Sequence, residues 1–202
     1  MKKSILTAVA VTALLASGYS IAGGDVEAGK TKAAVCGACH GADGNSINPD
    51  WPSLAGQGAG YLFKQLSDFK NNKRSDAIMA PQVATLSEQD MHDLAAYFSS
   101  QTAKAGKADQ NQIELGEAVY RGGNSATGVA ACIGCHGPTG SGNPAAKFPK
   151  VSGQHAAYTE AQLNAFQSSA RNNDAGKMMR NLTIRLTDAE IKAVSQYISG
   201  LK

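Results

Sequence analysis

The chain has 202 residues and a formal net charge of +3, and only 6% of its residues are aromatic. This length suits one medium-sized domain or two small ones, and the composition excludes collagen-like, coiled-coil and strongly disordered chains. Four cysteines are too few for a disulfide-dense scaffold, and the mild charge, without a Lys/Arg block, argues against nucleic-acid binding. With so few aromatic residues, the core needs something else to supplement it.

The N-terminus has the pattern of an export signal. Lys2 and Lys3 precede an apolar run over residues 5–16, which is too short to span a bilayer comfortably, and Ala22 ends a small-residue cleavage motif. We predict a signal peptide at residues 1–22, rather than an uncleaved membrane anchor. The mature chain then has a net charge of +1 and an extracytoplasmic destination.

The rest of the chain contains one internal repeat. The segment Cys36–Gly41, with the sequence CGACHG, recurs 96 residues later as CIGCHG at Cys132–Gly137, and further matches continue in one register. A tandem duplication of a unit of about 80–90 residues explains these matches, with a polar linker near residues 101–112. We therefore predict two domains, at residues 23–105 and 106–202.

Three helices are predicted in the first half. The first, over residues 26–38, leads into the cysteines. In the second, Leu62, Leu66 and Phe69 share one face at helical spacing. The last begins at a capping box, in which Ser87 is followed three residues later by an acidic residue.

The second half repeats this order. A helix over residues 114–121 leads toward the cysteines, Leu163 and Phe166 repeat part of the apolar face, and Thr187 opens the second capping box. No convincing strand pattern is present, so we predict an all-α fold. The Gly/Asn/Pro-rich loops after each histidine are long for such small units, which indicates that they wrap around something.

Each Cys-x-x-Cys-His segment is the signature of covalent haem attachment. Two cysteines three residues apart project from one helical turn and match the two vinyl groups of a haem, to which their thiols add as thioethers. The adjacent histidine then lies under the iron and supplies its proximal nitrogen ligand. The predicted residues are Cys36, Cys39 and His40 for the first haem, and Cys132, Cys135 and His136 for the second.

Three other uses of the cysteines are alternatives. A zinc site usually draws its cysteine pairs from one compact module, whereas these pairs lie in separate repeats. A thioredoxin-like redox motif needs a βαβ context that is missing, and a disulfide across one helical turn would constrain almost nothing. Haem attachment is therefore favoured over all three.

Two methionines are candidates for the sixth iron ligand. Met79 and Met179 lie seven residues before Leu86 and Leu186, in what reads as the loop before each capped helix. A thioether is a soft, neutral ligand, and His/Met ligation raises the reduction potential relative to two histidines. Methionine is also a common core filler, and the adjacent Met178 competes with Met179 for the second iron.

Several polar and proline residues are candidates for supporting roles. Pro52 and Pro149 follow their histidines by 12 and 13 residues, so their carbonyls are candidate acceptors for the second imidazole nitrogen, unless the prolines only shape the loop. Arg74 and Arg171 could face haem propionates, but we expect them to be ordinary surface charges. His92 and His155 have no repeat partner, and we expect them at solvated helix positions. Tyr61 and Tyr158 pack either near the haems or elsewhere in the core or on the surface.

The paired haem motifs, the two Pro-x-Leu/Val-x-Gly-Gln segments and Met79-Ala-Pro before Leu-Ser resemble the cytochrome c4 family across essentially the whole mature chain. This resemblance implies two tandem class I cytochrome c-like domains, related by a pseudo-twofold axis, in the bacterial periplasm. It implies haem edges that approach each other across the domain interface. The residues that it implies are His40 and Met79 at haem 1, His136 and Met179 at haem 2, and Pro52 and Pro149 behind the histidines.

An iron with two protein ligands has no vacancy for a substrate, so we predict an electron carrier and not an enzyme. Residues 23–105 carry a net charge of −2 and residues 106–202 carry +3, so the halves present different fields to a donor and an acceptor. The resemblance implies a cytochrome bc complex or a quinol-oxidising chain as donor and a haem–copper terminal oxidase as acceptor, with possible peripheral membrane association. A dihaem peroxidase or thiosulfate-oxidising enzyme, or a haem-based sensor, is the alternative, and each needs one labile or open iron site.

Overall fold

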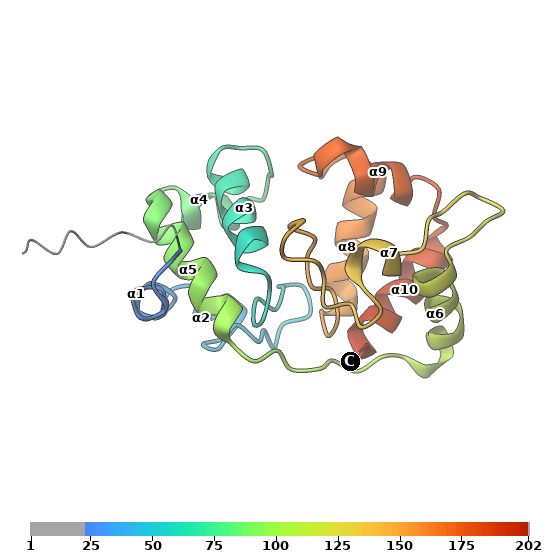
Figure 1. Ribbon diagram of the computed structural model, residues 1–202, viewed down its shortest axis with the longest axis horizontal. Coiled ribbons are helices and arrows are strands. Elements are labelled where there is room, and N and C mark those ends of the chain that lie inside the picture. The colour runs from blue at the N-terminus through green and yellow to red at the C-terminus, as the bar shows by residue number, and fades with distance from the viewer. Residues whose placement is uncertain (1–22, 202) are drawn as a thin grey trace, which may run out of the picture.

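The computed structural model of the chain describes residues 23–201, so the predicted signal peptide lies outside the described residues. Within this range, two groups of helices are joined by an extended segment (Figure 1). The β pairing there is limited to two isolated bridges, Asn124–Val129 and Asn143–Phe148. The predicted all-α fold is confirmed. None of the helices in the described part is long and apolar enough to cross a membrane.

The first domain contains five helices, which are α1 (Val26–Lys32), α2 (Gly37–His40), α3 (Ala59–Lys70), α4 (Met79–Val83) and α5 (Glu88–Ser100). The predicted continuous helix over residues 26–38 is wrong, because a turn at residues 33–36 separates α1 from α2. Ala33 is buried in the core at this turn, so tertiary packing overrides the local helical pattern. The capping box at Ser87 is confirmed.

Helix α1 crosses α5 at a glycine. A Cβ added to Gly29 would lie 2.0 Å from the carbonyl oxygen of Asp93 and 2.8 Å from the Cβ of Tyr97, so only glycine permits this approach. Helix α3 packs against the other side of α5 through the predicted apolar face. The buried core is formed by Ala33, Leu62, Leu94, Ala95, Tyr97 and Phe98.

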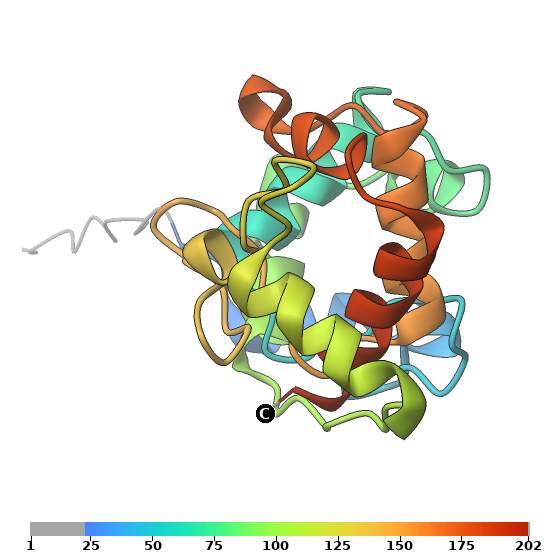
Figure 2. The same cartoon turned by 90° about the vertical axis from the view of Figure 1, so that its right-hand side faces the viewer.

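The second domain repeats this arrangement with α6 (Ile113–Gly122), α7 (Ile133–His136), α8 (Ala156–Gln167), α9 (Met178–Thr183) and α10 (Asp188–Gly200), and with short 3-10 helices at Gln110–Gln112 and Ala175–Lys177. Helix α6 lies across α10 (Figure 2). Their crossing point is Gly116, whose added Cβ would lie 2.3 Å from the carbonyl oxygen of Ala193. The capping box at Thr187 is also confirmed. Unlike the first domain, this one inserts a loop with the Asn124–Val129 bridge before its cysteines.

The segment between the domains is hydrogen-bonded to both of them. The Asn45 side chain donates to the carbonyl of Thr102 at 3.0 Å and accepts from the N–H of Lys104 at 2.8 Å. On the other side, the Ser199 hydroxyl donates to the carbonyl of Lys107 at 3.2 Å. These contacts hold the linker along the bottom of both domains in the view of Figure 1.

The domains meet through reciprocal contacts, as a pseudo-twofold relationship requires. The Gln57 side chain makes two hydrogen bonds of 2.9 Å to the backbone N–H and carbonyl of Lys150. Its repeat counterpart, Gln154, makes the same pair of 2.9 Å bonds to the backbone of Ser53. Each domain therefore offers an equivalent loop to the other.

Candidate functional site

The cysteines lie at the start of a single helical turn in each domain. Cys36 precedes α2 and Cys39 lies within it, and Cys132 and Cys135 are placed in the same way at α7. All four thiols are free. Burial raises the pKa of Cys36, and it raises the pKa of Cys132 to about 11, which is opposite to the low pKa of thioredoxin-like cysteines. Among residues 23–201, no group of three or more His, Cys, Asp or Glu side chains is arranged to hold a metal ion such as zinc.

Each histidine is oriented by the predicted proline carbonyl. The Nδ1 atom of His40 lies 2.8 Å from the carbonyl oxygen of Pro52, and that of His136 lies 2.9 Å from the carbonyl of Pro149. Since a carbonyl only accepts, Nδ1 must carry the proton, which leaves Nε2 with the lone pair that a metal ion needs. Burial lowers the pKa of both imidazoles and so favours their neutral form. This donor set fits a haem iron.

The two candidate methionines occupy equivalent positions. Met79 precedes Val83 by four residues, and Met179 precedes Thr183 by four residues. Val83 and Thr183 are 1% and 0% exposed, and the carbonyl of each accepts a hydrogen bond from the leucine N–H three residues later. By contrast, Met178 is 47% exposed. The register of α9 therefore aligns Met179, and not Met178, with Met79.

The predicted loop position of these methionines is wrong, because each lies in a short helix. Met79 is the first residue of α4, and Met179 is the second residue of α9. The carboxylate of Asp76 accepts from the backbone N–H groups of Ile78 and Met79, both at 2.9 Å, and so stabilises the start of α4. An acidic residue three positions before the methionine was the available sequence signal for this turn.

The expected surface position of Arg171 is wrong. Its guanidinium is buried at the domain interface, where it donates to the Tyr61 hydroxyl and to Gln65 Oε1 of the first domain, both at 3.0 Å. It also lies over the ring of Phe166, with 4.5 Å to the ring centroid. Arg171 therefore joins the two domains.

Arg74 makes the mirror-image contacts. It donates to the Tyr158 hydroxyl at 3.0 Å and to Gln162 Oε1 at 2.8 Å in the second domain, and it lies 4.6 Å from the ring centroid of Phe69. The sequence signal for this pair was present, because the two arginines and the two tyrosines are repeat equivalents. Their meeting across the interface depends on the way in which the domains dock.

The interface is electropositive among the described residues. Neither guanidinium donates to a carboxylate there. Burial would raise the pKa of Tyr61, but the positive charges of Arg171 and Arg74 outweigh burial and lower it. Two sequestered cations without acidic partners suit an anionic group, and haem propionates have that chemistry. This is a second respect in which the residues fit a haem.

Both remaining histidines differ from the expected solvated positions. The Nε2 of His155 donates to the carbonyl of Ser46, across the interface, at 2.9 Å. The ring of His92 stacks on Phe63, with a centroid distance of 3.9 Å and an interplanar angle of 8°. Both contacts join segments distant in sequence, so neither could be predicted from the local pattern.

Comparisons with known proteins agree with this geometry. The sequence model of the family described as Cytochrome c matches residues 26–102 and 113–202. Cytochrome c4 of Pseudomonas aeruginosa is 50% identical, covering 92% of each chain. The crystal structure of reduced recombinant cytochrome c4 from Pseudomonas stutzeri superposes with a TM-score of 0.87 at 48% identity, covering 89% of this chain and all of that one. A thiosulfate dehydrogenase electron acceptor of Stutzerimonas stutzeri is 36% identical, covering 84% of this chain and 80% of that one.

Proposed function

The chain belongs to the cytochrome c family, and from this premise we propose that it is a periplasmic carrier that shuttles electrons through two His/Met-ligated haems. As a two-domain relative of cytochromes c4, it is a dihaem electron-transfer protein with two covalently bound haem c groups. The observation that carries the proposal is the equivalence of the two ligand sets, with a proline-oriented histidine and a methionine in the same register in each domain.

In the proposed ligation, the thiols of each cysteine pair hold one haem as thioethers. His40 and Met79 would hold the first iron, and His136 and Met179 would hold the second. When bound, the haem supplies reversible one-electron oxidation and reduction. The chain's task is to hold a neutral imidazole at a fixed angle, which Pro52 and Pro149 do, and to keep the ligands away from water.

We further propose that residues 1–22 form a signal peptide cleaved near Ala22, and that the domains divide at residue 105. The sequence pattern supports the signal peptide, and the hydrogen-bonded linker at residues 102–107 supports the boundary. Export also suits thioether attachment and periplasmic redox partners.

The proposed partners are a cytochrome bc complex or similar respiratory donor and a haem–copper terminal oxidase as acceptor, with peripheral association at the membrane. The charge difference between the halves, −2 against +3, supports docking of different partners at the two ends. Reduction by the donor and oxidation by the acceptor should therefore depend differently on ionic strength. Rates that are equally independent of salt would contradict this division.

The alternative function is a dihaem enzyme of the peroxidase or thiosulfate-oxidising type with one labile ligand. The similarity to a thiosulfate dehydrogenase electron acceptor is the observation that favours a role in sulfur oxidation. However, that relative is named for accepting electrons, and the two ligand sets here are equivalent. We therefore propose that the chain has no catalytic activity of its own.

Spectroelectrochemical titration of the holo-protein tests the ligation. Met79→Ala and Met179→Ala should each remove the methionine-to-iron charge-transfer band of one domain, whereas Met178→Ala should remove neither and serves as the matched control. The two single variants should also lower the reduction potential of the altered haem. A five-coordinate iron at either site in the resting protein, or loss of a band in Met178→Ala, would contradict the proposal.

A further inference from the structure

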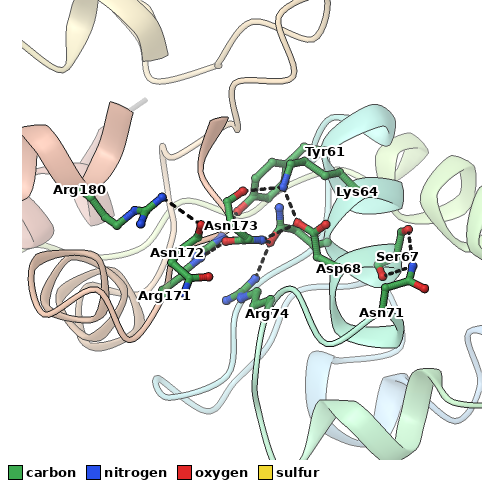
Figure 3. A network of polar contacts seen from close by, with 11 residues as sticks. Tyr61, Lys64, Ser67, Asp68, Asn71, Arg74, Arg171, Asn172, Asn173 and Arg180 are labelled. Carbon is green, nitrogen blue, oxygen red and sulfur yellow. Dashed lines mark hydrogen bonds and ion pairs between the residues drawn. The ribbon is translucent and has the colours of Figure 1, made fainter. Parts of the chain in front are cut away.

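The segment that leads to Met179 is longer than the segment that leads to Met79. Arg171 precedes Met179 by eight residues, whereas its counterpart Arg74 precedes Met79 by five. The longer segment passes close to the first domain, where Asn173 reaches α3 (Figure 3).

Asn173 is fastened to α3 from both its side chain and its backbone. The side-chain amide donates to Asp68 Oδ2 at 2.6 Å and to Gln65 Oε1 at 3.0 Å. The ammonium of Lys64 donates to the Asn173 carbonyl at 2.8 Å and also pairs with Asp68. Of the three contacts between Asn173 and α3, those with Asp68 and Lys64 involve a charged partner, which makes a hydrogen bond stronger than one between neutral groups.

The same segment is tied to the residue that follows Met179. Both carboxylate oxygens of Asp174 accept from Arg180, one from its backbone N–H at 3.0 Å and one from its Nε at 2.7 Å. The side chains of Asp174 and Arg180 are 4% and 21% exposed, so the carboxylate of this pair is shielded from water. Arg180 also donates to the carbonyl of Asn172 at 3.2 Å. A continuous line of polar contacts therefore runs from α3 of the first domain to the neighbour of Met179.

The first domain has no counterpart of this line among the described residues. The residue after Met79 is Ala80, and residues 75–78 make no hydrogen bond to the second domain. The α8 counterparts of Lys64 and Asp68 are Ala161 and Ala165, as the equivalent backbone bonds from Arg74 to Asp68 and from Arg171 to Ala165 show. Of the two equivalent places in the domain pair, only one therefore has the residues for this contact: the segment before Met179 and α3. The segment before Met79 and α8 lack them among the described residues.

We propose that Asn173 is a positioning residue that fastens the Met179 segment to the first domain, so that domain docking strengthens methionine ligation at the second haem alone. This inference rests on the proposed ligand role of Met179. If it is correct, breaking the contact raises the fraction of the second haem from which the methionine has detached. An added ligand that competes with methionine then binds more tightly in proportion to that fraction.

Imidazole is a suitable competitor, and the oxidised holo-protein is the sample. Its binding is followed at each haem through the shifted methyl resonance of the bound methionine, assigned with Met79→Ala and Met179→Ala. Asn173→Ala removes both side-chain bonds to the first domain and also the bond that Asn173 Oδ1 accepts from Arg171 Nε at 3.1 Å. It should tighten imidazole binding at the second haem by about tenfold and leave the first haem unchanged. Asn172→Ala is the matched control, since that side chain is exposed and makes no hydrogen bond within the described residues.

A second variant acts from the opposite domain. Lys64→Met keeps the aliphatic stem but removes the ammonium that holds the Asn173 carbonyl, so it should weaken methionine ligation at the second haem although it lies in the first domain. It also replaces the first test if Asn173→Ala does not fold. An unchanged imidazole affinity at the second haem, or an equal change at both haems, would overturn the inference. If Met179→Ala leaves both methionine resonances in place, the ligand assignment fails and the inference fails with it.

Discussion

The two domains share a helical frame, but each holds the loop after its haem motif with a tyrosine from a different helix. In the first domain, the Tyr97 hydroxyl on α5 donates to the carbonyl of Ala42, just after the haem motif, at 2.9 Å. In the second, Tyr120 on α6 donates instead to the carbonyl of Gly137, at 2.7 Å, which is the counterpart of Gly41 and so lies one position earlier in the loop. The repeat equivalent of Tyr97 is Tyr197, whose hydroxyl accepts from Arg121 near the surface.

A single position explains this exchange. The counterpart of Tyr120 in the first domain is Ala33, and both are buried. A small residue there leaves room for Tyr97 to reach inward, whereas the Tyr120 ring fills the space and stacks at an angle on Tyr197, with 5.5 Å between ring centroids. The comparison shows that the duplicated domains both keep a tyrosine bond to the loop after the haem motif and a filled volume, but supply them from different positions.

The largest effect is expected at the glycine crossings, where the domains should behave alike. Gly29→Ala and Gly116→Ala each force a Cβ to within about 2 Å of a carbonyl oxygen, so the helices must separate. Each should lower the free energy of unfolding by about 3 kcal/mol, measured by denaturant titration of the holo-protein. Gly122→Ala is the control, because nothing lies within 4 Å of its added Cβ. If Gly116→Ala were as mild as this control, the shared crossing would be wrong.

The tyrosine exchange predicts that repeat-equivalent substitutions differ. Tyr120→Phe leaves the Gly137 carbonyl with the N–H of Gly140 as a donor and should cost about 1 kcal/mol. Tyr97→Phe leaves the Ala42 carbonyl without a donor and should cost about 2 kcal/mol. Tyr197→Phe should cost well under half of that, since among residues 23–201 its hydroxyl bonds only the surface pair of Arg121 and Glu117. Thermal unfolding of the three variants makes the comparison, and equal losses in Tyr97→Phe and Tyr197→Phe would contradict it.

The capping boxes predict equal and smaller losses. The side chains of Ser87 and Thr187 each accept a hydrogen bond from the backbone N–H three residues later, and Asp90 and Glu190 return the bond. Ser87→Ala and Thr187→Ala should therefore each cost about 1 kcal/mol in denaturant unfolding. Glu88→Ala, in the same first turn but outside the capping box, is the control. A difference of more than twofold between the two caps would show that these termini are not equivalent.

The smallest effect concerns the linker, which an ion pair ties to the first domain alone. The hydrogen bond from Lys104 lowers the pKa of Asp43 to about 2 from 3.8, and the counterpart of Asp43 in the second domain is Thr139. The lowered pKa means that the pair stabilises the fold above about pH 4, and that this contribution disappears as the pH falls toward 2. Because the Asp43 side chain is 46% exposed, the contribution should be at most about 1 kcal/mol.

Asp43→Asn tests this contribution. The variant should be slightly less stable than the natural protein at pH 6 and equally stable near pH 2, and 1 M salt should reduce the difference at pH 6. Asp50→Asn is a control, since Asp50 forms no ion pair within the described residues. A larger difference at low pH than at neutral pH would contradict the predicted sign.

The sequence alone determined the helical class, the haem-attachment motifs and the capped final helices, because each depends on residues within a few positions of one another. It also determined the duplication, because these local motifs recur about 100 residues later in one register. The sequence also selected the two prolines that lie behind the histidines, because nearly the same spacing, 12 and 13 residues, occurs in both halves. Only the tertiary structure decided where Arg171, His155 and Asn173 lie, since their partners are about 100 residues away. Repeats reveal which residues correspond within each domain, but contacts between domains depend on how two finished surfaces dock, which no local pattern encodes.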